Sequence, residues 1–229
     1  MTSPAKLPLR EEEVQVQADD LLLEGNLAIP SNAHGLVVFA HGSGSSRHSS
    51  RNRHVAGILN EAGLGTLLFD LLTAAEERLD SRSGHLRFDI PFLAKRVIDA
   101  TDWLGKQQLT APLRLGYFGA STGAAAALVA AASRSEVVRA VVSRGGRPDL
   151  AGDALPHVKS PTLLIVGGND VPVIGMNQEA LRRLGTPERQ LIIVPGASHL
   201  FPEPGALEEV AQLAAGWLTR FLGASAPPA

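Results

Sequence analysis

The chain has 229 residues, with 21 basic and 23 acidic side chains, 45% hydrophobic residues and no cysteine. The missing cysteine excludes a disulfide scaffold, a cysteine zinc site and a thiol nucleophile. A net charge of −2 argues against nucleic acid or an anionic membrane as a partner, and no apolar run approaches a membrane span. We therefore expect a protein of the cytoplasm, with a single domain of residues 11–222 between flexible tails at 1–10 and 223–229.

The domain is predicted to begin with a β-hairpin. Residues Glu13 to Ala18 alternate polar and apolar side chains, which is the period of a half-buried strand. Asp19 and Asp20 form a turn signal, and the apolar stretch Leu21–Ile29 follows it. Two strands joined by so short a turn must be antiparallel neighbours.

After Pro30 the pattern changes to short, continuous apolar runs, which are typical of parallel strands buried on both faces. These runs are Leu36–Ala40, Thr66–Phe69, Leu113–Phe118, Val137–Val142, Thr162–Val166 and Leu191–Val194. Segments with helical spacing lie between them, and the clearest contains Leu207, Trp217 and Leu218. The alternation predicts an α/β fold with a doubly wound parallel sheet and helices on both faces. Ligands of such folds bind at the carboxyl ends of the strands.

A serine motif follows the strand predicted at Leu113–Phe118. The sequence Gly119-Ala120-Ser121-Thr122-Gly123 leads from this strand into an alanine-rich helix, which is the setting of a nucleophile elbow. So sharp a turn needs small neighbours, and the helix start offers N–H groups to a developing oxyanion. We predict Ser121 as the nucleophile and the N–H of Thr122 as an oxyanion donor. The alternative is a glycine-rich turn whose serine has no chemical role.

A serine nucleophile needs a general base, and His199 is the best placed of the seven histidines. It follows the last predicted strand and precedes the C-terminal helix. His41 also ends a strand, but it comes before the serine, and we expect it to pack against or bond its own loop. His34, His85 and His157 fall in turns or loops and are expected to be solvated.

The base needs an orienting acid, and Asp170 follows the next-to-last predicted strand. The chain order serine, aspartate, histidine is that of α/β-hydrolases. Asp149 and Asp153 stay open as alternatives, because some hydrolases carry the acid one strand earlier. Asp70 precedes the serine, and we expect it to bond backbone at the end of its strand.

The loop His41–Arg47 is rich in glycine and serine and follows an early strand. Loops at this place supply the second oxyanion donor in α/β-hydrolases, and we predict the N–H of Ser43 for this role. Gly42 is a predicted substrate-binding residue, since a glycine lets a ligand approach the backbone closely.

Metal and nucleotide chemistry are not indicated. His41, His48 and His54 lie close in sequence, but the pattern H-E-x-x-H is missing, so no catalytic metal is expected. The glycine-rich loop lacks the glycine–lysine ending of a phosphate-binding P-loop. A dinucleotide fingerprint fails as well, because Arg47 stands where its last glycine should be.

Arginines follow two of the strands near the predicted site. Arg47, Arg51 and Arg53 come after the early strand, and Arg144 and Arg147 come after the strand Val137–Val142. Guanidinium groups suit carboxylates and phosphates, so we predict that Arg47 and Arg144 bind a negative group of the substrate. The alternative is that these arginines are solvated or form structural salt bridges.

The segment between Val142 and Thr162 is too short for a helical cap domain, so an open, shallow pocket is expected. The long connection Leu71–Phe88 is the predicted partial lid. A connection of this length is either functional or contains a short helix.

Five segments together resemble one family: His41–Asn52, Thr66–Thr73, Gly116–Gly123, Ser143–Leu150 and Ala197–Phe201. The chain is similar over nearly its whole length to dienelactone-hydrolase-type members of the α/β-hydrolase superfamily. It is especially similar to small hydrolases that occur alone or fused to a phosphoribosyltransferase domain. The resemblance implies an eight-stranded, mostly parallel sheet, a Ser–Asp–His triad and no cofactor. Dienelactone hydrolases proper use a cysteine nucleophile, so the resemblance does not extend to dienelactone as substrate.

We therefore predict a serine carboxylesterase that acts on small esters, as a monomer or homodimer. Lactones, thioesters and amides are further substrates for the same mechanism. A rival hypothesis is a non-catalytic binding module on this fold, and a second is a phosphate-handling enzyme that uses the glycine-rich loop and the arginines.

Overall fold

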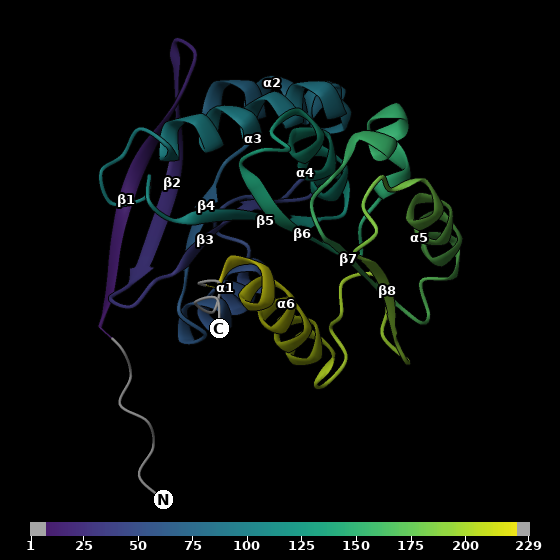
Figure 1. Cartoon of the computed structure of the whole chain (residues 1–229). Coiled ribbons are helices and arrows are strands. Elements are labelled where there is room, and N and C mark those ends of the chain that lie inside the picture. Colours follow the sequence, from purple (N-terminus) through teal and green to yellow (C-terminus); the bar gives the residue numbers. More distant parts are fainter. Residues whose placement is uncertain (1–7, 224–229) are drawn as a thin grey trace, which may run out of the picture.

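The computed structural model describes residues 8–223 of the chain (Figure 1). The strands are β1 (Leu9–Ala18), β2 (Leu21–Pro30), β3 (Gly35–Ala40), β4 (Leu64–Phe69), β5 (Arg114–Ala120), β6 (Val138–Arg144), β7 (Thr162–Gly167) and β8 (Arg189–Val194). The α-helices are α1 (Ser50–Glu61), α2 (Ala74–Ser83), α3 (Ile90–Leu104), α4 (Thr122–Ser133), α5 (Val171–Arg183) and α6 (Ala206–Leu222). Two 3₁₀ segments complete the fold, η1 (Leu86–Phe88) and η2 (Pro148–His157).

The eight strands form one sheet in the order β1-β2-β4-β3-β5-β6-β7-β8. β2 pairs antiparallel with both β1 and β4, whereas every later pair of neighbours is parallel. The predicted hairpin and the mostly parallel eight-stranded sheet are confirmed. Strand β3 lies between β4 and β5, so the chain adds β4 on one side of β3 and then β5 on the other. The loops after β3 and β5 therefore meet at the switch point, where ligands bind in such sheets.

The sheet begins earlier than the sequence indicated. β1 starts at Leu9, which pairs with Pro30 at the far end of β2, so residues 9 and 10 of the predicted N-terminal tail belong to the sheet. Strand β2 is ten residues long and offers backbone hydrogen-bond partners along its full length. The polar sequence at the start of β1 does not indicate this pairing. At the other end α6 stops at Leu222, while residues 1–7 and 224–229 of the predicted tails lie outside the described residues.

Helices cover both faces of the sheet. Figure 1 shows α3 and α4 on one side and α1 and α6 on the other. Along β6 the side chains alternate between these layers, because successive residues of a strand point to opposite faces. Val141 belongs to the core under α3 and α4, whereas Ala140 and Val142 belong to the core under α1 and α6.

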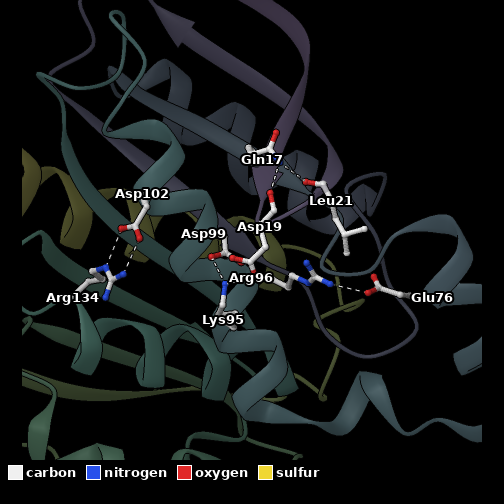
Figure 2. Close-up of polar contacts among 9 residues, drawn as sticks. All are labelled: Gln17, Asp19, Leu21, Glu76, Lys95, Arg96, Asp99, Asp102 and Arg134. Carbon is white, nitrogen blue, oxygen red and sulfur yellow. Dashed lines mark hydrogen bonds and ion pairs between the residues drawn. The ribbon is translucent and has the colours of Figure 1, made fainter.

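Helix α3 is joined to its neighbours by ion pairs (Figure 2). These pairs are Lys95–Asp19, Arg96–Glu76 and Asp102–Arg134, with N–O distances of 2.8, 2.7 and 2.7 Å. The first and last are exposed, and such pairs contribute about 0–1 kcal/mol each. Arg96 is buried, and Glu76 also accepts from the N–H of Thr73 in the capping box of α2. This carboxylate therefore fixes both the start of α2 and its position against α3.

The connection predicted as a partial lid contains α2 and η1, so it does contain a short helix. Buried Asp80 pairs with Arg87, and this pair joins the two pieces. The Arg87 guanidinium lies 3.9 Å from the point that a Cβ on Gly44 would occupy, so the connection borders the glycine-rich loop. The expected absence of a cap domain is confirmed, since only η2 lies between β6 and β7.

Candidate active site

Ser121 occupies a strained turn between β5 and α4. Its backbone has φ 51° and ψ −123°, a combination that side-chain-bearing residues rarely adopt. The N–H of Ser121 donates to the carbonyl of Arg144 at 3.3 Å, and its own carbonyl accepts from the N–H of Arg147 at 3.0 Å. The segment after β6 therefore holds the turn on both sides.

The glycines of the serine motif are required by backbone contacts. A Cβ on Gly123 would lie 2.2 Å from the carbonyl oxygen of Ala40, and one on Gly119 would lie 2.4 Å from the Cα of Ala124. Gly42, on the neighbouring loop, leaves only 3.0 Å between its Cβ position and the Cβ of Ser121. The small residues thus allow β3, β5 and α4 to meet at the serine.

Gly123→Ala is expected to destabilise the protein by about 3 kcal/mol, because overpacking against backbone cannot be relieved by a rotamer change. Gly57→Ala is the matched control, since nothing lies within 4 Å of a Cβ built at this exposed position of α1. Alanine is favoured over glycine inside a helix by up to about 1 kcal/mol, so the control is expected to be neutral or stabilising. Urea unfolding of both variants measures the difference. Equal stability of Gly123→Ala and wild type would contradict the contact.

Asp170 and His199 form a hydrogen-bonded pair. The Nδ1 atom of His199 lies 2.6 Å from Oδ2 of Asp170, and the Asp170 side chain is only 14% exposed. Their loops are cross-linked, because Asn169 donates from its backbone N–H to Ala197 at 2.9 Å and from its side chain to Gly196 at 2.8 Å. With Nδ1–H bound to the carboxylate, Nε2 of the neutral ring is left as the basic nitrogen.

Gly145 connects the serine turn with this pair. A Cβ at Gly145 would lie 2.7 Å from the carbonyl of His199 and 3.6 Å from its Nδ1, and Gly145 follows the residue that accepts from the Ser121 N–H. The three predicted residues thus gather at the carboxyl ends of β5, β7 and β8. Within residues 8–223 no hydrogen bond joins the Ser121 hydroxyl to His199, and such contacts commonly tighten only when substrate binds.

The other aspartates that the sequence left open are bound to arginines. Asp149 forms a two-pronged pair with Arg147 at 2.9 and 2.8 Å, and exposed Asp153 lies 3.3 Å from Arg183. Asp70 accepts from the backbone N–H of Arg47 at 2.7 Å and from its guanidinium, in line with the expected strand-end role. Among the predicted acids, Asp170 is the one that bonds the ring of His199.

The predicted oxyanion donors lie next to each other. Thr122 is the first residue of α4, and its buried hydroxyl accepts from the N–H of Ser43 at 2.9 Å. The Ser43 amide thus points to the serine turn, but in this structure it bonds a side chain that sequence reasoning did not consider. A ligand oxyanion would have to replace the Thr122 hydroxyl as its acceptor.

His41 holds the glycine-rich loop in place. Its Nε2 accepts from the N–H of Leu71 at 3.1 Å, so its Nδ1 carries the proton and donates to the carbonyl of Gly42 at 3.0 Å. Burial lowers the pKa of His41, and this cause outweighs its hydrogen bond to Gly42 and the nearby charge of Asp70. The neutral ring is therefore part of the folded state, as expected for a residue that bonds its own loop.

Acidification below pH 6.5 is expected to reduce the free energy of unfolding. In the unfolded chain His41 is protonated at its ordinary pKa of 6.5, whereas in the folded chain its lowered pKa keeps the ring neutral to lower pH. The stability linked to His41 is complete above that pH and is lost as the pH falls. One group of this kind changes the stability by at most about 1.4 kcal/mol per pH unit. Urea unfolding at pH 7, 6 and 5 should show a shallower loss in His41→Gln than in wild type. Identical slopes would contradict the assignment.

The arginines predicted to bind substrate have different surroundings. The Arg47 guanidinium pairs with Asp70, so it already has an anionic partner. Arg144 is only 6% exposed, and its Nε and Nη1 atoms are buried without a hydrogen-bond partner among the described residues. Burial lowers the pKa of Arg144 to about 10, with a further contribution from the charge of Arg51.

Residues 8–223 contain neither a metal-binding cluster nor a membrane-spanning helix. No group of three or more histidine, aspartate or glutamate side chains in this range is arranged to hold a metal ion. Nor does this part of the chain contain a helix that is long and apolar enough to cross a membrane.

The sheet order, the serine turn between β5 and α4 and the loops after β7 and β8 are those of the α/β-hydrolase class. The chain belongs to the dienelactone hydrolase family, whose model matches residues 23–222. The resemblance found in the sequence is thereby confirmed, and the protein is a member of a hydrolase family.

Similar proteins and solved structures agree with the assignment to this family. A crystal structure of a dienelactone hydrolase from Anabaena variabilis is 62% identical, with a TM-score of 0.92 over 93% of this chain and 99% of that one. Two Mycobacterium tuberculosis proteins whose names describe them as phosphoribosyl transferases are 58% identical over 96% of this chain. The chain spans only 48% of their length, about half. Est1E from Butyrivibrio proteoclasticus, 15% identical with a TM-score of 0.76 over 93% of this chain and 99% of that one, shows the fold alone.

Proposed function

We propose that this protein is a serine hydrolase that cleaves small carboxylic esters through Ser121, His199 and Asp170. The observation that carries the proposal is the 2.6 Å contact between His199 and Asp170, placed at the sheet edge where Ser121 sits in its strained turn. A carboxylate bound to one nitrogen of a histidine leaves the other nitrogen to act as a base, which is the arrangement of a catalytic triad.

In the proposed reaction the Ser121 oxygen attacks the ester carbonyl while Nε2 of His199 takes the hydroxyl proton. The resulting tetrahedral oxyanion accepts hydrogen bonds from the N–H of Thr122 and the N–H of Ser43. His199 then donates its proton to the leaving alkoxide, and an acyl-enzyme remains on Ser121. Water, activated by the same histidine, attacks this acyl group and releases the acid. Asp170 holds the ring in its tautomer and stabilises its positive charge.

Exposed apolar side chains favour a small substrate with an apolar part. Val171 follows the acid and is 68% exposed, and Leu200 follows the histidine and is 45% exposed. The connection from β6 to β7 contains no cap to enclose a long chain. Short acyl or alcohol groups therefore fit this open site better than long ones.

The test uses p-nitrophenyl acetate and butyrate as substrates and a fluorophosphonate as a covalent probe. The wild-type protein is expected to hydrolyse both esters, and mass spectrometry is expected to find the probe on Ser121. Binding of these esters without turnover and without labelling would favour the rival hypothesis of a binding module. Phosphate release from a phosphate ester that survives in Ser121→Ala would instead favour the phosphate-handling enzyme.

Lactones are a second candidate substrate class. A relative that is 62% identical is described as a dienelactone hydrolase, and a lactone is a cyclic ester that the same groups would open. The proposed nucleophile is a serine and the chain has no cysteine, so we keep the ordinary ester as the first candidate substrate. Comparing kcat/KM for a simple lactone with that for p-nitrophenyl butyrate ranks the two classes.

The remaining sequence expectations stay predictions. They concern the cytoplasmic location, the monomer or homodimer, the single domain between flexible tails (with its start moved from residue 11 to Leu9 by strand β1), a reaction without a cofactor, and the absence of a nucleic-acid partner. Thioesters and amides likewise stay open as substrates of the same mechanism.

A further inference from the structure

We propose that Arg144 and Arg51 form an anion-binding subsite beside Ser121, which holds a carboxylate or phosphate group carried by the ester substrate. This inference rests on the proposed ester hydrolysis and narrows its substrate class. The sequence suggested Arg47 and Arg144 for this role, whereas the structure favours a different pair.

The first observation is the burial of Arg144 without a partner. The residue is 6% exposed, and two of its three guanidinium nitrogens, Nε and Nη1, are buried with no hydrogen-bond partner among the described residues. A buried cation without a counter-charge is costly, so such groups are normally paired. An anionic group of a ligand would supply both the missing hydrogen bonds and the missing charge.

The second observation is the positive surroundings of Arg144. Arg51 lies in the first turn of α1, and its Nε is also buried without a partner among the described residues. The charge of Arg51 acts on Arg144, and the first turn of α1 carries no acidic residue. The N-terminus of a helix is itself the positive end of its dipole. Two cations that repel each other at such a place favour the binding of an anion.

The position of Arg144 places this subsite next to the nucleophile. Arg144 is the register partner of Ala120, the residue before Ser121, and neighbouring strands lie about 4.8 Å apart. Its side chain continues the alternation of Ala140 and Val142, so it points to the layer of α1, where Arg51 lies. A ligand whose carbonyl lies at Ser121 can therefore extend a charged end toward the two arginines.

Other arginines near the site already have partners. Arg47 pairs with Asp70, and Arg147 forms a two-pronged pair with Asp149. These pairs leave their guanidinium groups less able to bind a substrate anion. Arg53, two residues after Arg51 on α1, is exposed and serves as a matched control.

The experiment compares anionic with neutral esters of matched size. One pair is the mono-p-nitrophenyl ester of adipate against p-nitrophenyl hexanoate, which places the carboxylate on the acyl half. The other pair is 4-acetoxybenzoate against 4-methylphenyl acetate, which places the carboxylate on the alcohol half. The readout is the ratio of kcat/KM for the anionic ester to that for the neutral one, in wild type, Arg144→Met, Arg51→Met and Arg53→Met.

We expect the ratio for at least one pair to fall at least tenfold in Arg144→Met and in Arg51→Met, and to stay within about twofold of wild type in Arg53→Met. Ratios that stay at the wild-type value in the first two variants, for both pairs, would overturn the subsite. If Arg144→Met does not fold, Arg51→Met decides the outcome, because it removes the partly exposed member of the pair.

A binding measurement separates this proposal from the proposed function. Titration calorimetry of Ser121→Ala with monomethyl adipate or inorganic phosphate needs no turnover. Binding that is lost on adding Arg144→Met or Arg51→Met supports the subsite even if no ester is hydrolysed, and the two probes show whether carboxylate or phosphate is preferred. No binding of either probe, together with unchanged ratios, would refute it while leaving ester hydrolysis intact.

Discussion

Ser121→Ala is expected to lower kcat/KM for p-nitrophenyl butyrate by about 10⁴- to 10⁶-fold. The alanine side chain has no oxygen to attack the carbonyl, so no acyl-enzyme can form. The donors proposed for the oxyanion belong to the backbone of Thr122 and Ser43, so they remain, and a small residual rate over water is expected. Alanine keeps the turn compact, and the thermal midpoint should change little.

Ser45→Ala is the control for this result. Ser45 lies in the glycine-rich loop, where its backbone N–H donates to the carbonyl of Gly42 at 3.1 Å, and this bond survives the substitution. Its kcat/KM should stay within about threefold of wild type. Ester hydrolysis that survives at the wild-type rate in Ser121→Ala would exclude Ser121 as the nucleophile.

Asp170→Asn is expected to lower kcat/KM by about 10⁴-fold. The Asp170 carboxylate accepts from Nδ1 of His199 at 2.6 Å, and this bond leaves Nε2 as the unprotonated nitrogen of the ring. An amide that donates to Nδ1 instead places the ring proton on Nε2, where it cannot accept the serine proton. The loss should therefore appear chiefly in kcat, with small effects on the fold.

Asp149→Asn tests the alternative acid with the same chemical change. Asp149 is bound to Arg147, so its amide variant should keep activity within about tenfold of wild type. A double variant of Ser121→Ala and Asp170→Asn should be no slower than Ser121→Ala alone, because groups that act as a unit are not additive. A large loss in Asp149→Asn with an active Asp170→Asn would move the acid to the loop after β6.

Much of the fold is predictable because its elements have strong local signals. The continuous apolar runs after Pro30 become β3 to β8. Strands β3 to β7 lie inside the sheet and are buried on both faces, which requires apolar side chains at nearly every position. The edge strand β8 has the same apolar pattern but is partly exposed. The start of β1 at Leu9 was less predictable, because the exposed residues of this edge strand give no apolar signal. The pairing with β2 alone determines where it begins.

The candidate site also has one part that local sequence predicts and another that depends on tertiary contacts. A glycine-flanked serine between a strand and a helix is a local signal, and Ser121 does have the positive φ of a nucleophile turn. The choice among the aspartates depended on contacts between distant segments. Asp170 reaches His199, whereas Asp149 and Asp70 are bound by nearby arginines.

The class of fold, the serine motif and the chain order of its proposed partners can be read from the sequence, because they depend on local spacing and on chain order. The pairing of Arg47 with Asp70 and the burial of Arg144 without a hydrogen-bond partner at Nε and Nη1 became visible in the folded structure. Burial and charge pairing arise when strands and helices from distant parts of the chain come together. The presence of an arginine in a sequence does not show whether its charge is paired with a carboxylate of the protein or is left to bind a substrate.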